Sequence, residues 1–448
     1  MAWLKDVLEI KQPPCSSGPP VFLPNHSQDG FPRYWTQVEH WLRPIAAGQN
    51  CYWEDAIAAL EEIIRLGRLI PTGVPDLSVL YEFIKRDVNE EYERLLPWLA
   101  QWALAVPALF PQRLHKLSSR VNGYLALSRE QVRCLLALMF WCAFPLPTSH
   151  NTQKNPANTL LKLFGRPKAG REEAQLAKLH CILQYFLQST ATLGSDYLVF
   201  RRVSQRITLP GDALRFQQVM VVPGPSSHVE SYPNCIQVDF ADKNFGGGVL
   251  TSGSAQEECM LVAYAEPIVG LLFVDQLQDE EVLIVSGVRL YNQYEGFSGS
   301  LKWQQGVVEA VDGRMIVALD AEDYRKREQD QYQRRSIERE LKKAVLGFGA
   351  TLAPDSYEVV TGNWGCGVFK GDIQLKFLIQ WVAATFCHRN MSYLTWNNSD
   401  LANLTEWVNF FNQYSTNQVL EALFKLKPPG MRVFEQVKTL LGQKWWQS

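Results

Sequence analysis

Residues 238–258 read VDFADKNFGGGVLTSGSAQEE, and the rest of the chain is organised around them. The pattern predicts the end of a strand over Cys235–Phe240, a polar loop, three adjacent glycines and the start of an apolar helix or strand. Three glycines have no side chain to bury and cost conformational entropy to order, so we expect a sharply turned backbone here. We expect its N–H groups to stay free, and such a loop can bind an anion.

Two glutamates, Glu257 and Glu258, follow at the edge of an apolar run, Met260–Val262. A carboxyl group at this position is expected to be partly desolvated, and such a glutamate can keep its proton near neutral pH and act as a general acid. Glycines beside a glutamate therefore indicate hydrolysis next to a bound diphosphate. The alternative is that both glutamates are solvated helix residues without a chemical role.

The same residues resemble the signature of the poly(ADP-ribose) glycohydrolases, in which three glycines, a short spacer and Gln-Glu-Glu follow a strand. The matching positions here are Gly246, Gly247, Gly248, Gln256, Glu257 and Glu258, preceded by the strand Gln237–Ala241. By resemblance the three glycines and Gln256 are expected to bind the substrate. The resemblance extends over roughly 125–397. It implies a macrodomain-like three-layer α/β/α core with a mixed central sheet, preceded in the sequence by an N-terminal helical accessory domain.

The adjacent glutamates limit the mechanism. Most glycosidases place two carboxylates on opposite sides of the scissile bond, which neighbouring residues cannot do, so one glutamate must do most of the proton transfer. By resemblance, Glu258 protonates the leaving ribose oxygen and then activates water against an oxocarbenium-like centre. Glu257 is expected to hold ribose hydroxyls, and we place Asp239 with them in the catalytic set.

A second glycine-rich stretch, Thr361–Asp372, reads TGNWGCGVFKGD and precedes an apolar helical pattern. A glycine loop at a helix N-terminus is suited to a diphosphate, because free N–H groups and the helix dipole favour negative charge. A tight strand-to-helix turn is the alternative. The stretch resembles the family element that holds the ligand's diphosphate, which implies ligand contacts at Asn363, Gly365, Gly367 and Phe369.

Aromatic residues lie between the two loops, in Tyr291–Phe297. Such rings suit stacking on a base or covering a sugar, although they can also be a hairpin that only packs. By resemblance Tyr294 and Phe297 contact the ligand, Trp396 stacks on the adenine, and Glu230 contacts the adenine.

Two residues depart from the family pattern. Phe297 stands where the family has a tyrosine, so the ring is kept and its hydroxyl is lost. Asp242 stands where the family has an asparagine that contacts the terminal ribose, and a carboxylate can accept hydrogen bonds but cannot donate them. These departures make a catalytically weak or inactive ADP-ribose reader the competing hypothesis, and a purely structural interaction protein the third.

The composition of the 448 residues bounds the remaining possibilities. A 46% apolar chain of this length can bury a large core, and a net charge of −2 gives no general attraction to duplex nucleic acid. No apolar run reaches the roughly 18–20 residues that span a bilayer, so we expect a soluble protein without a membrane partner. The implied partners are poly(ADP-ribose), ADP-ribose and poly(ADP-ribosyl)ated proteins, and we expect a monomer.

Nine cysteines without a Cys-x-x-Cys pair and seven separated histidines do not form a zinc-site pattern, and we expect neither metal nor cofactor. The odd cysteine count and the lack of a secretory leader favour a reducing compartment, the nucleus or the cytoplasm.

Along the chain, residues 1–50 are rich in proline and tryptophan and predict an extended arm, while residues 53–187 show helical spacing. Ser128 and Gln131 predict a capping box at a helix start. From residue 197 onward strands and helices alternate, which predicts a layered α/β domain. We therefore divide the chain into an arm with a helical accessory domain, 1–195, and a catalytic domain, 196–448.

The predicted strands of the second part are short runs rich in branched and aromatic residues. They are Tyr197–Arg202, Gln217–Val222, Cys235–Phe240, Val282–Val285 and Arg314–Leu319. The charged stretch Glu322–Val345 mixes signs at helical spacing and is predicted to be a helix with a solvated face.

Overall fold

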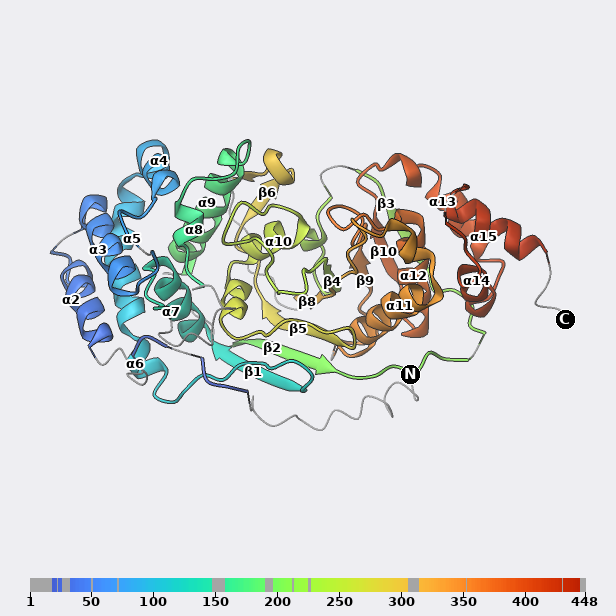
Figure 1. Cartoon of the computed structure of the whole chain (residues 1–448), viewed down its shortest axis with the longest axis horizontal. Coiled ribbons are helices and arrows are strands. Elements are labelled where there is room, and N and C mark those ends of the chain that lie inside the picture. The colour runs from blue at the N-terminus through green and yellow to red at the C-terminus, as the bar shows by residue number, and fades with distance from the viewer. Residues whose placement is uncertain are drawn as a thin grey trace.

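The computed structural model describes residues 18–443, with gaps at 22, 26–32, 50, 71, 147–157, 190–195, 212, 225–226, 305–313, 352 and 429. The helices α2 to α9 gather at one end of the molecule and α11 to α15 at the other, with a central sheet between them (Figure 1). The α-helices are α2 Tyr34–Ala46, α3 Trp53–Leu66, α4 Ser78–Asp87, α5 Glu90–Leu104, α6 Val106–Leu109, α7 Arg129–Phe140, α8 Leu161–Phe164, α9 Glu172–Ser189, α10 Gln256–Tyr264, α11 Arg334–Gly349, α12 Ile373–Phe386, α13 Leu404–Phe411, α14 Thr416–Leu423 and α15 Val433–Gly442.

The sheet has eight strands in the order β1-β2-β5-β8-β4-β9-β10-β3, and β6 and β7 form a separate hairpin. The strands are β1 Gly123–Ser128, β2 Tyr197–Ser204, β3 Val219–Val222, β4 Ile236–Asp239, β5 Glu281–Val288, β6 Gln293–Glu295, β7 Lys302–Gln304, β8 Arg314–Ala318, β9 Val359–Thr361 and β10 Met391–Leu394. Pairing is antiparallel from β1 to β8 and parallel from β8 to β3. The predicted α/β architecture with a mixed central sheet is confirmed.

Alternation along the strands divides the interior into two apolar cores. In β5, Leu283 and Val285 belong to a core shared with α7, α9 and α10, whereas Val282 and Ile284 belong to a second core shared with α11 and α12. Successive side chains of a strand point to opposite faces, so both faces of the sheet are covered. This is the three-layer arrangement that the resemblance implied, and it agrees with the layered α/β domain that the alternation of strands and helices predicted.

All five strands predicted from composition are present, as β2, β3, β4, β5 and β8. The capping box is also confirmed: Ser128 accepts the N–H of Gln131, and the Gln131 side chain accepts the N–H of Ser128. The strands were recognisable from their branched and aromatic residues rather than from alternation, since β4 and β8 are buried at every position.

Three local predictions are wrong. The arm contains a helix, α2, because the chain after residue 33 is free of proline until Pro44 near the helix end; residues 1–17 lie outside the described part. The helical region contains a strand, β1, whose side chains alternate between buried and partly exposed. In the charged stretch, the α-helix begins only at Arg334, after a short 3-10 helix, η5 Glu328–Tyr332.

The division of the chain at residue 195 stays a prediction. Strand β1 pairs with β2 along its whole length, from Gly123 opposite Arg202 to Ser128 opposite Tyr197. The first part therefore contributes an edge strand to the sheet of the second. Among the described helices, none combines the length and apolar character that crossing a bilayer requires.

Candidate active site

The predicted site residues lie at one edge of the sheet. Strands β8, β4, β9, β10 and β3 run parallel, so their carboxyl ends share an edge. The loops after β3, β4, β9 and β10 carry Glu230, the glycine triplet, Asn363 and Trp396. In open α/β sheets, ligands bind outside the carboxyl ends of the strands. The topology thus brings together residues that are more than 160 positions apart in sequence.

The N–H groups of the glycine triplet are bonded within the protein. Gly246 donates to Oε1 of Glu257 at 2.6 Å, and Gly248 donates to Oε1 of Glu258 at 2.7 Å. The N–H of Gly247 donates to the carbonyl of Asn244 at 3.0 Å. The prediction that these N–H groups stay free for an anion is therefore wrong. The N–H groups of Gly246 and Gly248 are instead accepted by the carboxyl groups of the two glutamates in the first turn of α10.

Glycine is required here by both space and backbone conformation. Gly246 and Gly247 have φ of +90° and +47°. A Cβ on Gly247 would lie 2.6 Å from Oε1 of Glu258 and 2.7 Å from Oε2 of Glu257. Real Cβ atoms do not approach oxygen so closely, so a side chain at this position would displace both carboxyl groups. We refer to residues Gly246–Gly248 with Glu257 and Glu258 as the carboxylate clamp.

Each glutamate is held on both oxygens. Oε2 of Glu257 accepts the N–H of Asp242 at 2.9 Å, and Oε2 of Glu258 accepts the N–H of Ala255 at 2.7 Å. Four backbone donors therefore fix the orientation of the two carboxyl groups, independently of rotamer preference. Of the two, Glu258 is the more exposed, at 8% against 3% for Glu257. Both carboxyl groups are buried, and that of Glu258 lies slightly nearer the surface.

A third carboxyl group, that of Asp239, lies behind the clamp at the end of β4. It is fully buried, and among the described residues neither of its oxygens has a hydrogen-bond partner. Burial, followed by the charges of Glu258 and Glu230, raises the pKa of Asp239 well above its usual range. Burial and the charges of Asp239 and Glu258 likewise raise the pKa of Glu257. Burial and the neighbouring carboxyl groups thus disfavour the charged form of both acids.

Two of the predicted binding residues are engaged by the protein itself. Gln256 fastens α10 to β4, because its Oε1 accepts the N–H of Phe240 at 2.8 Å and its Nε2 donates to the carbonyl of Val238 at 3.2 Å. Oδ1 of Asp242 accepts the backbone N–H of Asn244 at 2.8 Å and its side-chain amide at 3.0 Å. One carboxylate oxygen of Asp242 is therefore already used within its own turn.

The predicted adenine contact, Glu230, lies in the 3-10 helix η2 Val229–Ser231 and pairs with the hairpin. The hydroxyl of Tyr294 donates to Oε1 of Glu230 at 3.0 Å, while Oε2 has no partner among the described residues. Burial raises the pKa of Glu230 to about 7. Beside them lies His228, whose ring is 4.3 Å from that of Tyr294.

An aromatic cluster connects the hairpin to the ends of β4 and β10. The rings of Phe297 and Trp396 meet edge to face at 6.1 Å, and so do those of Phe240 and Trp396. The indole N–H of Trp396 donates to the carbonyl of Ser227 at 2.7 Å, which fixes the ring. The residues predicted to stack on or cover a ligand are therefore in mutual contact.

The second glycine loop follows β9. The hydroxyl of Tyr393 donates to the side-chain oxygen of Asn363 at 3.1 Å, and Gly365 has a φ of +73°. Within the described residues, the N–H groups of Gly365 and Gly367 have no hydrogen-bond partner. A Cβ on Gly367 would meet nothing within 4 Å. This loop, unlike the triplet, presents open space and free donors.

The helix end beside this loop is not free. The side chain of Asp372 accepts the N–H groups of Gln374 and Leu375, each at 2.9 Å, and so caps α12. The N–H groups at the start of this helix are therefore not free, because an aspartate caps them, and the diphosphate site at this loop stays a prediction. Free donors for an anion remain in the loop itself.

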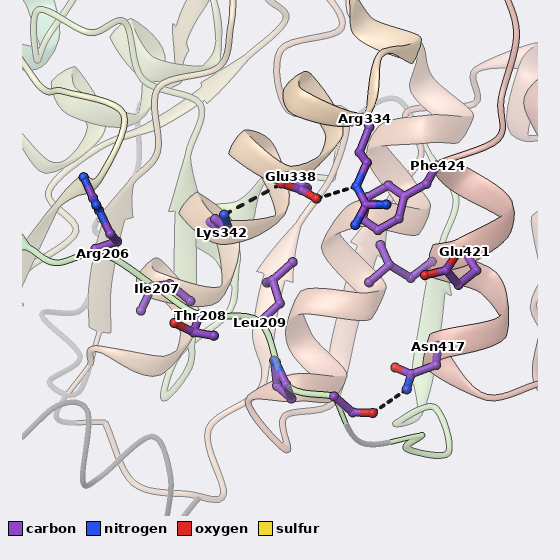
Figure 2. A pocket seen from close by; sticks show the side chains of 13 residues that line it. Arg206, Ile207, Thr208, Leu209, Arg334, Glu338, Lys342, Asn417, Glu421 and Phe424 are labelled. Carbon is purple, nitrogen blue, oxygen red and sulfur yellow. Dashed lines mark hydrogen bonds and ion pairs between the residues drawn. The ribbon is translucent and has the colours of Figure 1, made fainter.

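Two clefts differ in their relation to these residues. A cleft of about 460 Å³ is lined by Asp242 and Phe369, together with acidic and basic residues after β8. A cleft of about 560 Å³ lies between the segment after β2 and helices α11 and α14, and none of the predicted site residues lines it (Figure 2). The cleft of about 460 Å³ therefore borders the site, through Asp242 and Phe369.

Sequence reasoning missed three residues that contact the site. Phe240 packs on Trp396, His228 packs on Tyr294, and Lys178 of α9 bonds to the loop after the triplet. A lysine within the apolar sequence of α9 was a weak signal of a buried role for Lys178. Nothing in the sequence marked Phe240 or His228. In the described part of the chain, no three His, Cys, Asp or Glu side chains are grouped as metal ligands.

Two family models match the chain. Residues 213–403 match "Poly (ADP-ribose) glycohydrolase (PARG), Macro domain fold", and residues 85–202 match "Poly (ADP-ribose) glycohydrolase (PARG), helical domain". Together they cover well over half of the chain.

Three curated relatives are similar over long segments. Poly(ADP-ribose) glycohydrolase 1 of Caenorhabditis elegans is 28% identical over 86% of this chain and 51% of its own length. Poly(ADP-ribose) glycohydrolase 1 of Arabidopsis thaliana is 26% identical over 84% of this chain and 87% of its own length. Poly(ADP-ribose) glycohydrolase 2 of C. elegans is 32% identical over 45% of this chain and 46% of its own length. The chain thus spans about half the length of both nematode relatives.

Proposed function

This chain belongs to the poly(ADP-ribose) glycohydrolase family, and from that premise we propose that it hydrolyses the ribose–ribose O-glycosidic bonds of poly(ADP-ribose) and releases ADP-ribose. The observation that carries the proposal is the carboxylate clamp. Four backbone N–H groups hold two buried glutamates at the carboxyl ends of the parallel strands, beside an aromatic cluster, and Asp242, one of the four donors, lines a cleft.

In the proposed reaction Glu258 donates a proton to the leaving ribose oxygen as the glycosidic bond breaks. The resulting oxocarbenium-like centre is attacked by water, and Glu258 takes the proton of that water. Glu257 lies beside Glu258 with only 3% of its surface exposed, and its role in the reaction is to orient ribose hydroxyls. The pKa values of the buried acids Asp239 and Glu257, next to Glu258, are raised by burial and by the neighbouring carboxyl groups.

Binding of the nucleotide is proposed for the surrounding residues. The rings of Trp396 and Phe297 supply stacking surface for the adenine and ribose, and the free N–H groups of the second loop supply donors for the diphosphate. Glu230 is proposed to accept from the adenine through the oxygen that Tyr294 leaves unbonded.

The proposed partners are poly(ADP-ribose), ADP-ribose and proteins carrying the polymer, with no duplex nucleic acid or membrane, and the proposed state is a monomer. We place the protein in the nucleus or the cytoplasm. The eight cysteines of the described residues are all free, which supports a reducing compartment.

A Glu258→Gln variant tests the proposal. Loss of a general acid removes about 10²–10⁴-fold in rate, so labelled polymer should be cleaved at least 100-fold more slowly, while ADP-ribose affinity is kept. Because the new amide faces backbone donors, thermal unfolding is measured in parallel. Glu338→Gln, in the larger cleft, serves as the control. If the wild-type chain binds ADP-ribose but never cleaves polymer, it is an ADP-ribose-binding module and not an enzyme. If it does not bind ADP-ribose at all, it is neither an enzyme of this kind nor a binding module.

A further inference from the structure

Lys178 lies in α9, in the helical part of the chain, yet its ammonium group points into the loop that follows the glycine triplet. Nζ donates to the carbonyl oxygens of Val249 at 3.0 Å, Gly253 at 2.6 Å and Gly248 at 3.4 Å, and also to that of Thr251. Four carbonyl dipoles of one six-residue loop therefore converge on a single cation from another part of the chain.

The lysine is completely buried, which is costly for an ammonium group unless its donors are satisfied. Burial lowers the pKa of Lys178 to about 8, against the opposing charge of Glu258. The other titratable groups that face it are Cys259 of α10, Arg171 before α9, and Cys181 of α9 itself. Glu258 is the one acid among these groups.

Gly248 connects this cation to the clamp. Its carbonyl faces Nζ of Lys178, while its N–H donates to Oε1 of Glu258 at 2.7 Å. Gly253, whose carbonyl is also bonded to the lysine, packs so closely that a Cβ there would lie 2.8 Å from the same glutamate oxygen. The loop thus has the lysine on one side and the glutamate on the other.

We propose that Lys178 is a positioning residue: it sets the Gly248–Gly253 loop, and through that loop the carboxyl group of Glu258, from the helical part of the chain. The inference rests on the proposed function of Glu258. It gives the helical region a part in catalysis, because without the cation the four carbonyls have no common donor and the loop that shapes the clamp is free to move.

Lys178→Met tests the proposal, since methionine fills the space of the buried stem without a charge or donor. We expect a roughly 100-fold lower kcat on polymer, the size of loss that a misplacement of about 1 Å produces. ADP-ribose affinity should stay near the wild-type value, because the proposed binding residues lie on other loops. Hydrogen exchange at the backbone amides of residues 248–255 should be faster.

The matched control is Arg133→Met. Arg133 is also a buried cation bonded to α9, but it donates to the carbonyl of Ser189 at the far end of the helix, at 2.6 Å. Its removal should lower stability without changing kcat or the exchange of residues 248–255. Lys178→Gln, which keeps two donors, is made in case the methionine variant does not fold.

The pH dependence of turnover and of unfolding free energy distinguishes a positioning role of Lys178 from a purely stabilising one. Because the native state holds the proton of Lys178 less tightly than the unfolded chain does, this group's contribution to the unfolding free energy rises above pH 8 and is lost as the pH falls through 8. Turnover should change in the opposite sense and decline above pH 8, as the ammonium is lost. Lys178→Met should remove that decline, whereas the stability trend from Lys343, whose pKa burial also lowers to about 8, remains in both proteins.

Three results would overturn the proposal: wild-type exchange at residues 248–255 in Lys178→Met, a kcat equal to that of Arg133→Met, or failure of both Lys178 variants to fold while Arg133→Met folds. If the wild-type chain does not cleave polymer, the proposed function fails, and the exchange comparison still decides whether Lys178 sets the loop.

Discussion

The two glycine-rich loops of the site have similar compositions and each precedes a helix, yet their backbone N–H groups have different partners. In the first loop, Gly246 and Gly248 donate to glutamates of the following helix, α10. In the second, the following helix is capped by its own aspartate, Asp372, and the donors of Gly365 and Gly367 have no partner among the described residues.

This difference shows that glycine content alone does not define an anion site. What matters is whether an acidic side chain of the protein already accepts from the loop. The first loop orients the carboxyl groups of Glu257 and Glu258, whereas the second loop has N–H groups that no described residue accepts. The following predictions test that contrast.

The largest expected effect is that of Gly247→Ala in the first loop. The new Cβ would lie 2.6 Å from Glu258 and 2.7 Å from Glu257, so both carboxyl groups must move. We expect kcat on polymer to fall roughly 100-fold. The unfolding free energy should fall by about 1–2 kcal/mol because of the positive φ. Gly430→Ala, where a Cβ meets nothing within 4 Å, is the control. Unchanged turnover in Gly247→Ala would show that the clamp does not set the reacting group.

The next effect concerns stability in the second loop, through Gly365→Ala. Gly365 has a φ of +73°, and its Cβ would lie 2.6 Å from that of Ala321. We expect a loss of about 2 kcal/mol in unfolding free energy, measured by chemical denaturation. A loss below a few tenths of a kcal/mol would mean that the loop tolerates another conformation and does not present its donors rigidly.

Gly367→Ala, two residues away, should give the opposite result. Its Cβ would meet no protein atom within 4 Å, so stability should not change. If the ligand's diphosphate fills that space, ADP-ribose affinity should fall about tenfold or more, as measured by calorimetry. Wild-type affinity in this variant would remove the second loop from the proposed binding site.

The strands and most residues of the two loops could be predicted from the sequence, but the hydrogen-bond partners of the glycine N–H groups could not. The strands were predictable because Val, Ile and Phe recur at short intervals, and the resemblance named Glu230, Phe297, Asn363 and Trp396, which the fold brings to one edge. The partners of the glycine donors were not predictable. They depend on α10 folding back over residues ten positions before it, which is a property of tertiary packing.

The same limit applies to the elements that sequence reasoning missed or misplaced. Lys178 is distant in sequence from the loop it bonds, and its carbonyl acceptors carry no sequence signal. Strand β1 was hidden in a helical region because it completes a sheet whose next strand, β2, begins only at Tyr197. Local periodicity predicts which residues are buried, and long-range pairing determines what they contact.

The smallest expected effect is at Asp372, which caps α12, the helix that follows the second loop. Asp372→Ala removes the acceptor for the N–H groups of Gln374 and Leu375 and should lower the unfolding free energy by about 1 kcal/mol. Asp372→Asn should not, because asparagine caps a helix as well as aspartate does.

Burial raises the pKa of Asp372, so the wild-type chain should lose stability relative to Asp372→Asn as the pH rises through that raised pKa, and the two should converge in acid. Thermal unfolding of the wild-type chain and of Asp372→Asn between pH 4 and pH 8 measures this difference in stability. If Asp372→Ala instead matched the wild-type chain at every pH, the aspartate would not occupy the helix end, and the helix dipole would again be free to bind the ligand's diphosphate beside the donors of Gly365 and Gly367.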